Sequence, residues 1–182
     1  MGRASSKTDF GSLLLNWYDS NAFPYPWRLS KDPYSVWLSE IMLQQTRVNT
    51  VVPYYNDWLV DLPSVAAVAR VDMEYILKKW EGLGYYARAR NFHSACKIIM
   101  NKHNGKVPDS ARLLLSLPGI GEYISGAIMS IAFNQPVPAI DSNAIRVISR
   151  LNSISGLLQI RNQKIARVLS KLICPLRPGD FN

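Results

Sequence analysis

The apolar residues of this chain recur mostly at the spacing of an α-helix. Those of the segment 86–103 form a single face, made up of Phe92, Ala95, Cys96, Ile99 and Met100, as in an amphipathic helix with about 3.6 residues per turn. Similar spacing predicts further helices over 32–44, 48–59, 72–80, 108–115, 122–133, 141–151 and 162–173. Because strand-like alternation is scarce, the pattern predicts an all-α protein.

Capping residues support these boundaries. Asp32 before Pro33 fits an N-cap followed by the first residue of a helix. Asp72 is placed to cap the short helix that follows it, and Asn104 with Gly105 ends the long helix. The connections are short and rich in proline or glycine, which is typical of a compact helical domain.

The charge is positive and unevenly distributed. Among 182 residues, 21 are lysine or arginine and 13 are aspartate or glutamate, for a formal net charge of +8. The segment 83–108 contains five basic residues and no acidic one, and 141–182 contains seven basic and two acidic residues. These segments could form a phosphate-binding surface or ordinary solvated helix faces, and charge alone does not decide between them.

Other features narrow the class of protein. No run approaches the roughly 18 apolar residues of a transmembrane helix, and no apolar region of a secretory signal follows the N-terminus. Residues 1–6 fit the N-myristoylation pattern, which is too loose to predict the modification. Neither Cys96 nor Cys174 belongs to a Cys-x-x-Cys pair, so we expect no metal site within this chain. These observations favour a soluble intracellular protein without a membrane anchor.

A short turn between two predicted helices is the first candidate for chemistry. The segment 117–123, LPGIGEY, contains Gly119 and Gly121, and a helix starts directly after them. Glycine allows positive φ and close approach of another backbone, and the free N–H groups of a helix start can bind a phosphate. The turn is either a helix–hairpin–helix element that contacts DNA backbone without reading sequence, or an ordinary turn.

Two acidic residues lie in apolar surroundings. Asp141 follows the apolar residues 138–140 at a helix start, where it fits an N-cap or a partly desolvated carboxylate near the turn. Glu40 belongs to an otherwise apolar helix, so it either faces solvent or is buried for a purpose. Burial raises the pKa of a carboxyl group, which can then serve as a general acid. For Asp141 and for Glu40, the residues alone do not decide between the two alternatives.

Four motifs occur together in one order. They are WLSEIMLQQT (37–46), GLGYYAR (82–88), the turn 117–123 and the segment around Asp141. In this order and spacing they closely resemble the mismatch-specific adenine DNA glycosylases of the MutY type, within the helix–hairpin–helix DNA glycosylase superfamily. The resemblance runs from about Leu13 to the last residue. It implies the all-α fold of that family, a role in base-excision repair, and a monomer associated with mismatch-containing double-stranded DNA in the cytoplasm or nucleoid.

The resemblance also implies a catalytic group. Glu40 matches the glutamate that protonates the adenine ring, and Asp141 matches the aspartate that stabilises the sugar cation. Tyr123 and Asn143 match residues that orient groups around the reacting sugar. In glycosidases, two carboxyl groups likewise flank a bond that breaks through an oxocarbenium-like transition state. The adenine must leave the duplex before this reaction can occur.

Further positions around the site follow from the same resemblance. The DNA-binding candidates are Gln45, Thr46, Tyr85, Arg88, Gly119 and Gly121. Among them, Gln45 and Tyr85 fall where similar enzymes wedge into the base stack around the opposing purine. The candidates around the extruded base are Trp27, Arg28 and Leu43. The residues expected in the core are Trp17, Trp37, Trp58 and Trp80.

Position 123 separates two branches of the superfamily. In the endonuclease III branch, a lysine at the corresponding place forms a Schiff base and the strand is cut. Tyr123 cannot perform that chemistry, so we expect no strong lyase activity. Ser142 departs from the glycine that is usual between the aspartate and the asparagine, but serine is small and suits a helix start.

The resemblance further implies a cofactor whose ligands this chain lacks. Family members normally continue into four cysteines that hold a [4Fe–4S] cluster and into a domain that recognises 8-oxoguanine. We therefore expect a C-terminally truncated chain in three parts. These are an N-terminal segment and helix of the cluster-side helical domain (1–30), a helical barrel domain with the hairpin (31–140), and the start of the cluster-side domain (141–182).

Three functions are compatible with these features. The first is monofunctional hydrolysis of the N-glycosidic bond of adenine mispaired with 8-oxoguanine or guanine, which the motifs at 37–46 and 82–88 favour. The second is the same chemistry on thymine or another mispaired pyrimidine. The third is a truncated, inactive fragment that still binds DNA.

Overall fold

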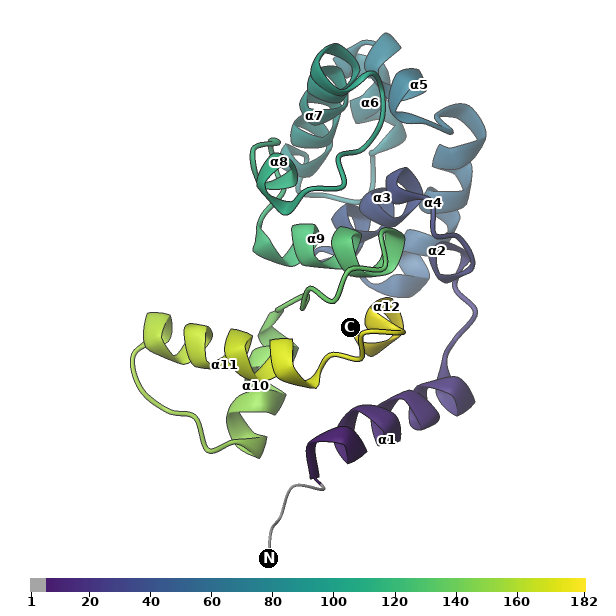
Figure 1. Cartoon of the computed structure of the whole chain (residues 1–182). Coiled ribbons are helices and arrows are strands. Elements are labelled where there is room, and N and C mark those ends of the chain that lie inside the picture. Colours follow the sequence, from purple (N-terminus) through teal and green to yellow (C-terminus); the bar gives the residue numbers. More distant parts are fainter. Residues whose placement is uncertain (1–5) are drawn as a thin grey trace, which may run out of the picture.

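The computed structural model describes residues 6–182, with the side chains of 6–9 and Leu158 left aside, so the N-myristoylation pattern lies almost wholly outside the described residues. The described part of the chain contains helices and no strand, which confirms the all-α prediction (Figure 1). Its helices are α1 (Ser6–Asn21), α2 (Pro26–Leu29), α3 (Pro33–Leu43), α4 (Val48–Asp61), α5 (Val65–Arg70), α6 (Met73–Lys79), α7 (Ala87–His103), α8 (Ala111–Leu115), α9 (Glu122–Ala127), η1 (Ile128–Ala132), α10 (Ser142–Leu151), α11 (Leu158–Leu172) and α12 (Pro178–Phe181).

Most predicted helix boundaries agree with the structure to within two residues. The Asp32 carboxylate accepts a hydrogen bond from the Ser35 N–H at 2.8 Å and so caps α3. Asn104 ends α7 with a left-handed backbone at φ 52°. Two boundaries differ. α8 begins only at Ala111, after Ser110 in extended conformation, and α11 begins four residues before the predicted start.

Four short elements were not predicted. α2, α5 and α12 have only four to six residues, which is too short for a helical period to be recognised in the sequence. The predicted helix 122–133 is divided, because α9 passes into the π-helical turn η1. Such turns are rare and occur often at functional sites.

The larger hydrophobic core surrounds α3. Trp37, Trp58 and Trp80 are each buried in it, as predicted, and Phe92 packs against Trp37 with ring centroids 4.4 Å apart. The indole N–H of Trp58 donates to the Tyr34 hydroxyl at 2.9 Å, so this buried donor keeps a partner. The packing fixes α3 and the position of its side chains.

A second, smaller core joins the two ends of the described chain. α1 packs there with α10, α11 and α12, and the buried members are Leu15, Ile148, Ile165, Leu169, Ile173 and Phe181 (Figure 1). Arg177 forms an ion pair with Asp19 of α1, which joins the C-terminal segment to α1 at the surface. The prediction of Trp17 in the core is wrong, since its side chain is 61% exposed. Residues two apart on a helix point in different directions, and Leu15 is the one that is buried.

The two cores meet where α12 packs against η1. A Cβ atom at Gly179 would lie 2.8 Å from the Ile131 Cα atom, so the two backbones touch. Within the described residues, no helix is both long and apolar enough to cross a bilayer.

Candidate active site

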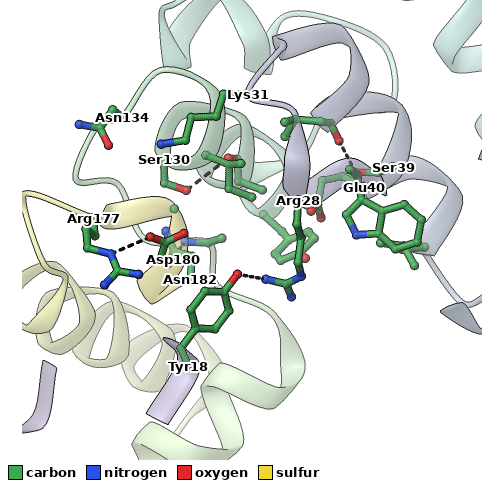
Figure 2. A pocket seen from close by; sticks show the side chains of 18 of the residues that line it. Tyr18, Arg28, Lys31, Ser39, Glu40, Ser130, Asn134, Arg177, Asp180 and Asn182 are labelled. Atoms are coloured by element: carbon green, nitrogen blue, oxygen red, sulfur yellow. Dashed lines mark hydrogen bonds and ion pairs between the residues drawn. The ribbon is translucent and has the colours of Figure 1, made fainter. Parts of the chain in front are cut away.

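Two cavities share one wall. The inner pocket, about 230 Å³, lies between the two cores and is lined by residues that include Tyr18, Trp27, Arg28, Ser130, Asp180 and Asn182 (Figure 2). The outer groove, about 760 Å³, is lined by residues that include Gln45, Tyr85, Arg88, Arg90, Asp141 and Ser142. Three side chains line both cavities, namely Glu40, Leu43 and Tyr123. A group in this wall can therefore act on a molecule that enters from the groove and fills the pocket.

Glu40 is the acidic group in the shared wall. It comes from α3, whose other side chains are mostly buried, and it is itself half-buried rather than solvent-facing. Burial raises the pKa of the Glu40 carboxyl, and the nearby negative charge of Asp141 raises it further. Hydrogen bonding with Tyr123 and the charge of Arg28 oppose this shift without cancelling it. The Glu40 carboxyl therefore keeps its proton to a higher pH than an exposed glutamate does.

Tyr123 reaches Glu40 from the other side of the wall. It is the second residue of α9, so the turn 117–121 determines where its side chain lies. Burial, together with the negative charge of Glu40, raises the pKa of the Tyr123 hydroxyl. The hydroxyl is therefore neutral at physiological pH and can form hydrogen bonds with Glu40 and with a bound molecule.

Asp141 is the N-cap of α10 and also lines the outer groove. Its Oδ1 atom accepts a hydrogen bond from the Ala144 N–H at 2.7 Å, which caps α10. Its carboxylate also lines the outer groove, so it is an N-cap with one face toward the cavity. Asn143 donates from Nδ2 to the Asp141 Oδ2 atom at 2.9 Å. Asn143 lines neither cavity, and its hydrogen bond holds one oxygen of the Asp141 carboxylate.

The turn between α8 and α9 has two glycines in different environments. Gly119 has φ +78°, and a Cβ atom there would lie 2.8 Å from the Asn91 Cβ atom. Gly121 has extended backbone at φ −95° and precedes α9 as its N-cap. Apart from Gly121 and its two chain neighbours, no described residue has an atom within 4 Å of a Cβ built on Gly121. The first glycine is needed for the fold, whereas the second leaves open space beside the helix start.

This difference gives a prediction about stability. Gly119→Ala should lower the free energy of unfolding by about 2 kcal/mol. A residue with a side chain is strained in left-handed backbone, and the added methyl group would also collide with Asn91. The melting temperature should fall by about 4–8 °C. The control Gly121→Ala should cost less than about 1 kcal/mol, the scale of a helix-cap change. Equal melting temperatures for the two variants in differential scanning calorimetry would contradict this assignment.

Gln45 and Tyr85 enter the outer groove from two turns. Both have left-handed backbone, with φ 56° at Gln45 and φ 49° at Tyr85, a conformation that non-glycine residues rarely adopt. Both are exposed, Tyr85 to 61%. Thr46 lies behind them and accepts a hydrogen bond from Arg88. The Arg88 side chain is directed toward protein acceptors rather than toward solvent, which the sequence did not indicate.

The residues predicted around an extruded base line the inner pocket. Trp27 is buried there, with its ring stacked on Tyr25 at 5.2 Å and edge-on to Tyr55 at 5.4 Å. Arg28 and Leu43 complete this side of the pocket. A flat aromatic wall beside a cation and a carboxylic acid suits a planar, polar ring.

No sequence pattern predicted the residues on the far wall of the inner pocket. Tyr18 of α1 accepts a hydrogen bond from Arg28, and the guanidinium lies 5.3 Å from the Tyr18 ring centroid (Figure 2). Asp180 and Asn182 reach the pocket from α12 and the residue after it. No motif includes these positions, because tertiary packing alone brings them to the site.

The described residues do not fit a metal cluster. No group of three or more histidine, cysteine or acidic side chains in this part of the chain could hold a metal ion. Cys96 is buried in the larger core, where burial raises the pKa of its thiol above the ordinary value, and Cys174 packs beside the smaller core. The thiolates that an iron–sulfur cluster requires are not gathered here.

An all-helical frame, a hairpin between α8 and α9, and two acidic residues, Glu40 and Asp141, that line one groove are features of the class of helix–hairpin–helix DNA glycosylases. Residues 38–175 match the family described as HhH-GPD superfamily base excision DNA repair protein. This chain belongs to that family.

Similar proteins agree with this assignment. The chain is 38% identical over 182 residues to the adenine DNA glycosylase of Buchnera aphidicola from Acyrthosiphon pisum, covering 97% of this chain and 51% of that protein. It is 38% identical to the adenine DNA glycosylase of Homo sapiens over 96% of this chain and 34% of that protein. The chain therefore spans about half of the length of the first relative and about a third of the second.

Solved structures share the fold. A thermostable thymine-DNA glycosylase superposes with a TM-score of 0.88 at 24% identity, over 99% of this chain and 85% of that one. A trapped endonuclease III–DNA covalent intermediate superposes with a TM-score of 0.79 at 18% identity, over 100% and 85% of the two chains.

Proposed function

We propose that this chain is the catalytic part of a monofunctional adenine DNA glycosylase, which removes adenine mispaired with 8-oxoguanine or guanine. The observation that carries this proposal is the position of Glu40, a half-buried carboxyl with raised pKa in the wall between the inner pocket and the outer groove. The relatives named adenine DNA glycosylase support adenine as the base.

The proposed reaction uses the two carboxyl groups in different states. Adenine rotated out of the duplex fills the inner pocket beside Trp27, Arg28 and Leu43. Protonated Glu40 donates its proton to the adenine ring, the bond between the ring and sugar C1′ breaks, and its electron pair leaves with adenine. Ionised Asp141 stabilises the positive charge on the sugar. Water then adds to C1′ and releases a proton.

Tyr123 and Asn143 orient this pair. The Tyr123 hydroxyl interacts with Glu40 from the side of α9, and Asn143 holds one oxygen of Asp141. Because Tyr123 has no amine, no Schiff base to the sugar can form at this position. The product is therefore an abasic site in an uncut strand.

DNA contacts are proposed along the outer groove. Gln45 and Tyr85 would enter the base stack around the opposing purine, and the open side of Gly121 would allow a phosphate to approach the start of α9. Arg90 lines the groove, and no partner of its guanidinium is found among the described residues, so it can pair with a phosphate. Binding to double-stranded DNA should weaken steeply with salt.

Several expectations about the whole protein accompany this proposal. The two hydrophobic clusters support the proposed division into a barrel domain, 31–140, and a second helical domain formed by 1–30 and 141–182, except that Trp27 packs in the larger cluster. A [4Fe–4S] cluster is expected for family members of full length, but no step proposed here depends on it. We expect a DNA-associated monomer in the cytoplasm or nucleoid.

The raised pKa of Glu40 predicts a pH-dependent cost in stability. The folded state binds the Glu40 proton more tightly than the unfolded chain, so this group's contribution to stability is lost as pH rises through the folded pKa. Glu40→Gln removes the charge and should raise the melting temperature at pH 8. At pH 5 the difference between variant and parent should shrink. An equal difference at both pH values would contradict the raised pKa.

The type of product tests the proposed function. Single-turnover reactions with a 5′-labelled duplex that contains adenine opposite 8-oxoguanine should show no strand break before treatment with alkali and a single break afterwards. Free adenine should appear at the same rate by chromatography. Strand cleavage without alkali, at the rate of base release, would contradict a monofunctional enzyme. Absence of base release under saturating protein would indicate an inactive DNA-binding fragment.

A further inference from the structure

Arg88 connects the two turns that border the outer groove. It is the second residue of α7, and its Nη1 atom donates to the carbonyl oxygens of Ile41 at 2.8 Å, Met42 at 2.9 Å and Gln44 at 2.6 Å. Its Nη2 atom donates to the Leu83 carbonyl at 3.0 Å and the Gly84 carbonyl at 3.1 Å. One guanidinium thus holds the C-terminal end of α3 and the turn before α7.

The acceptors lie directly beside the strained residues. The Gln44 carbonyl immediately precedes Gln45, and the Gly84 carbonyl immediately precedes Tyr85. Left-handed backbone at a non-glycine residue is strained and persists only where its surroundings fix it. Gln45 and Tyr85 both have this conformation. The Arg88 side chain therefore holds the backbone beside both strained residues.

Further contacts of Arg88 strengthen the connection. Its Nη2 atom also donates to the Thr46 hydroxyl at 3.1 Å, on the far side of Gln45. The guanidinium carbon lies 5.5 Å from the Tyr85 ring centroid and 5.3 Å from that of Trp80, within the range of cation–π attraction. Arg88 therefore contacts the Tyr85 ring as well as the backbone that precedes it.

We propose that Arg88 is a positioning residue, which sets Gln45 and Tyr85 together at the geometry needed to enter the DNA base stack. This inference rests on the proposed function, and it removes Arg88 from the direct DNA ligands expected from sequence. Both terminal nitrogens of Arg88 are already directed at protein acceptors. Lysine cannot replace it, because one ammonium group lacks the planar fork that reaches both turns.

Arg90 gives the matched contrast. It lies two residues further along α7, lines the same groove, and is exposed, with no partner of its guanidinium among the described residues. If Arg90 pairs with a phosphate, Arg90→Ala should weaken DNA binding and reduce the slope of log K against log salt by about 1. Arg88→Lys should leave that slope unchanged.

The first experiment measures excision and coupling. Arg88→Lys should slow single-turnover adenine release by about 100-fold, the scale of a misplaced positioning group. Tyr85→Ala in the Arg88→Lys background should add much less than it does alone, because both changes remove the same arrangement. Effects that multiply, or a salt slope that falls by about 1 in Arg88→Lys, would overturn the proposal.

The second experiment does not require adenine excision. Hydrogen–deuterium exchange of the free protein should show faster exchange at 44–46 and at 83–85 in Arg88→Lys, by about tenfold or more at both segments, with 117–121 unchanged. Unaltered exchange at either turn would overturn the proposal. If the parent chain releases no adenine but both turns loosen in this variant, the proposed function fails while the role of Arg88 in holding the turns stands.

Discussion

Glu40→Gln is expected to reduce adenine release by about 1,000-fold or more, the range of a general acid that donates in the rate-limiting step. Glutamine keeps the size of the side chain and its place in the wall between pocket and groove, but it has no acidic proton. The measurement is single-turnover release of adenine from a duplex with adenine opposite 8-oxoguanine. DNA affinity should change little, since Glu40 lies in the wall and is not a phosphate ligand.

A matched control exists on the same protein. Glu81 is exposed and pairs with Lys78 at 2.6 Å, and it lines neither the inner pocket nor the outer groove. Glu81→Gln makes the same chemical change and should leave adenine release unaltered. Parent-like activity of Glu40→Gln would show that another group protonates the base and would remove the main support for the proposed reaction.

Asp141→Asn is expected to slow adenine release by about 100- to 1,000-fold, which is typical for removal of one electrostatic stabiliser of the transition state. Asparagine is also a good N-cap, so α10 and the melting temperature should be preserved while the negative charge is lost. Asp141→Ala should lose the cap as well, at a further cost of about 1 kcal/mol in stability. Activity and melting curves of both variants separate the catalytic contribution from the structural one.

Asp72 provides the control for the two Asp141 variants. It is also an N-cap, and its carboxylate accepts a hydrogen bond from the Tyr75 N–H at 2.8 Å, outside both cavities. Asp72→Asn should leave adenine release at the parent rate. If Asp141→Asn is as active as the parent, then Asp141 is only a helix cap.

Local signals made most of the fold predictable. Some features depend only on residues within one helix, so the local sequence is enough to predict them. These are the apolar face of α7 and the caps at Asp32, Asp72 and Asn104. The exposed Trp17 was mispredicted because hydrophobicity does not say which face of α1 meets α11 and α12. The short helices α2, α5 and α12 are stabilised by packing rather than by a long periodic segment, and sequence alone gave them no signal.

The motifs of the candidate site could be predicted from the sequence, but the way in which they come together in space could not. Glu40, Tyr123 and Asp141 were named from sequence, and the structure brings all three to the outer groove. Tyr18 of α1 was missed, since its contact with Arg28 depends on how α1 packs beside α12. Arg88 was named with a different role, because its guanidinium meets the backbone carbonyls of two separate turns only in the folded protein.

The most direct test of the central claim is a single-turnover panel with four duplexes under saturating protein. These duplexes carry adenine opposite 8-oxoguanine, adenine opposite guanine, adenine opposite thymine, and thymine opposite guanine, and the free base is identified by chromatography. The proposed function predicts release of adenine from the first two duplexes and of no base from the other two. Preferential release of thymine, or release of no base from any duplex, would contradict it.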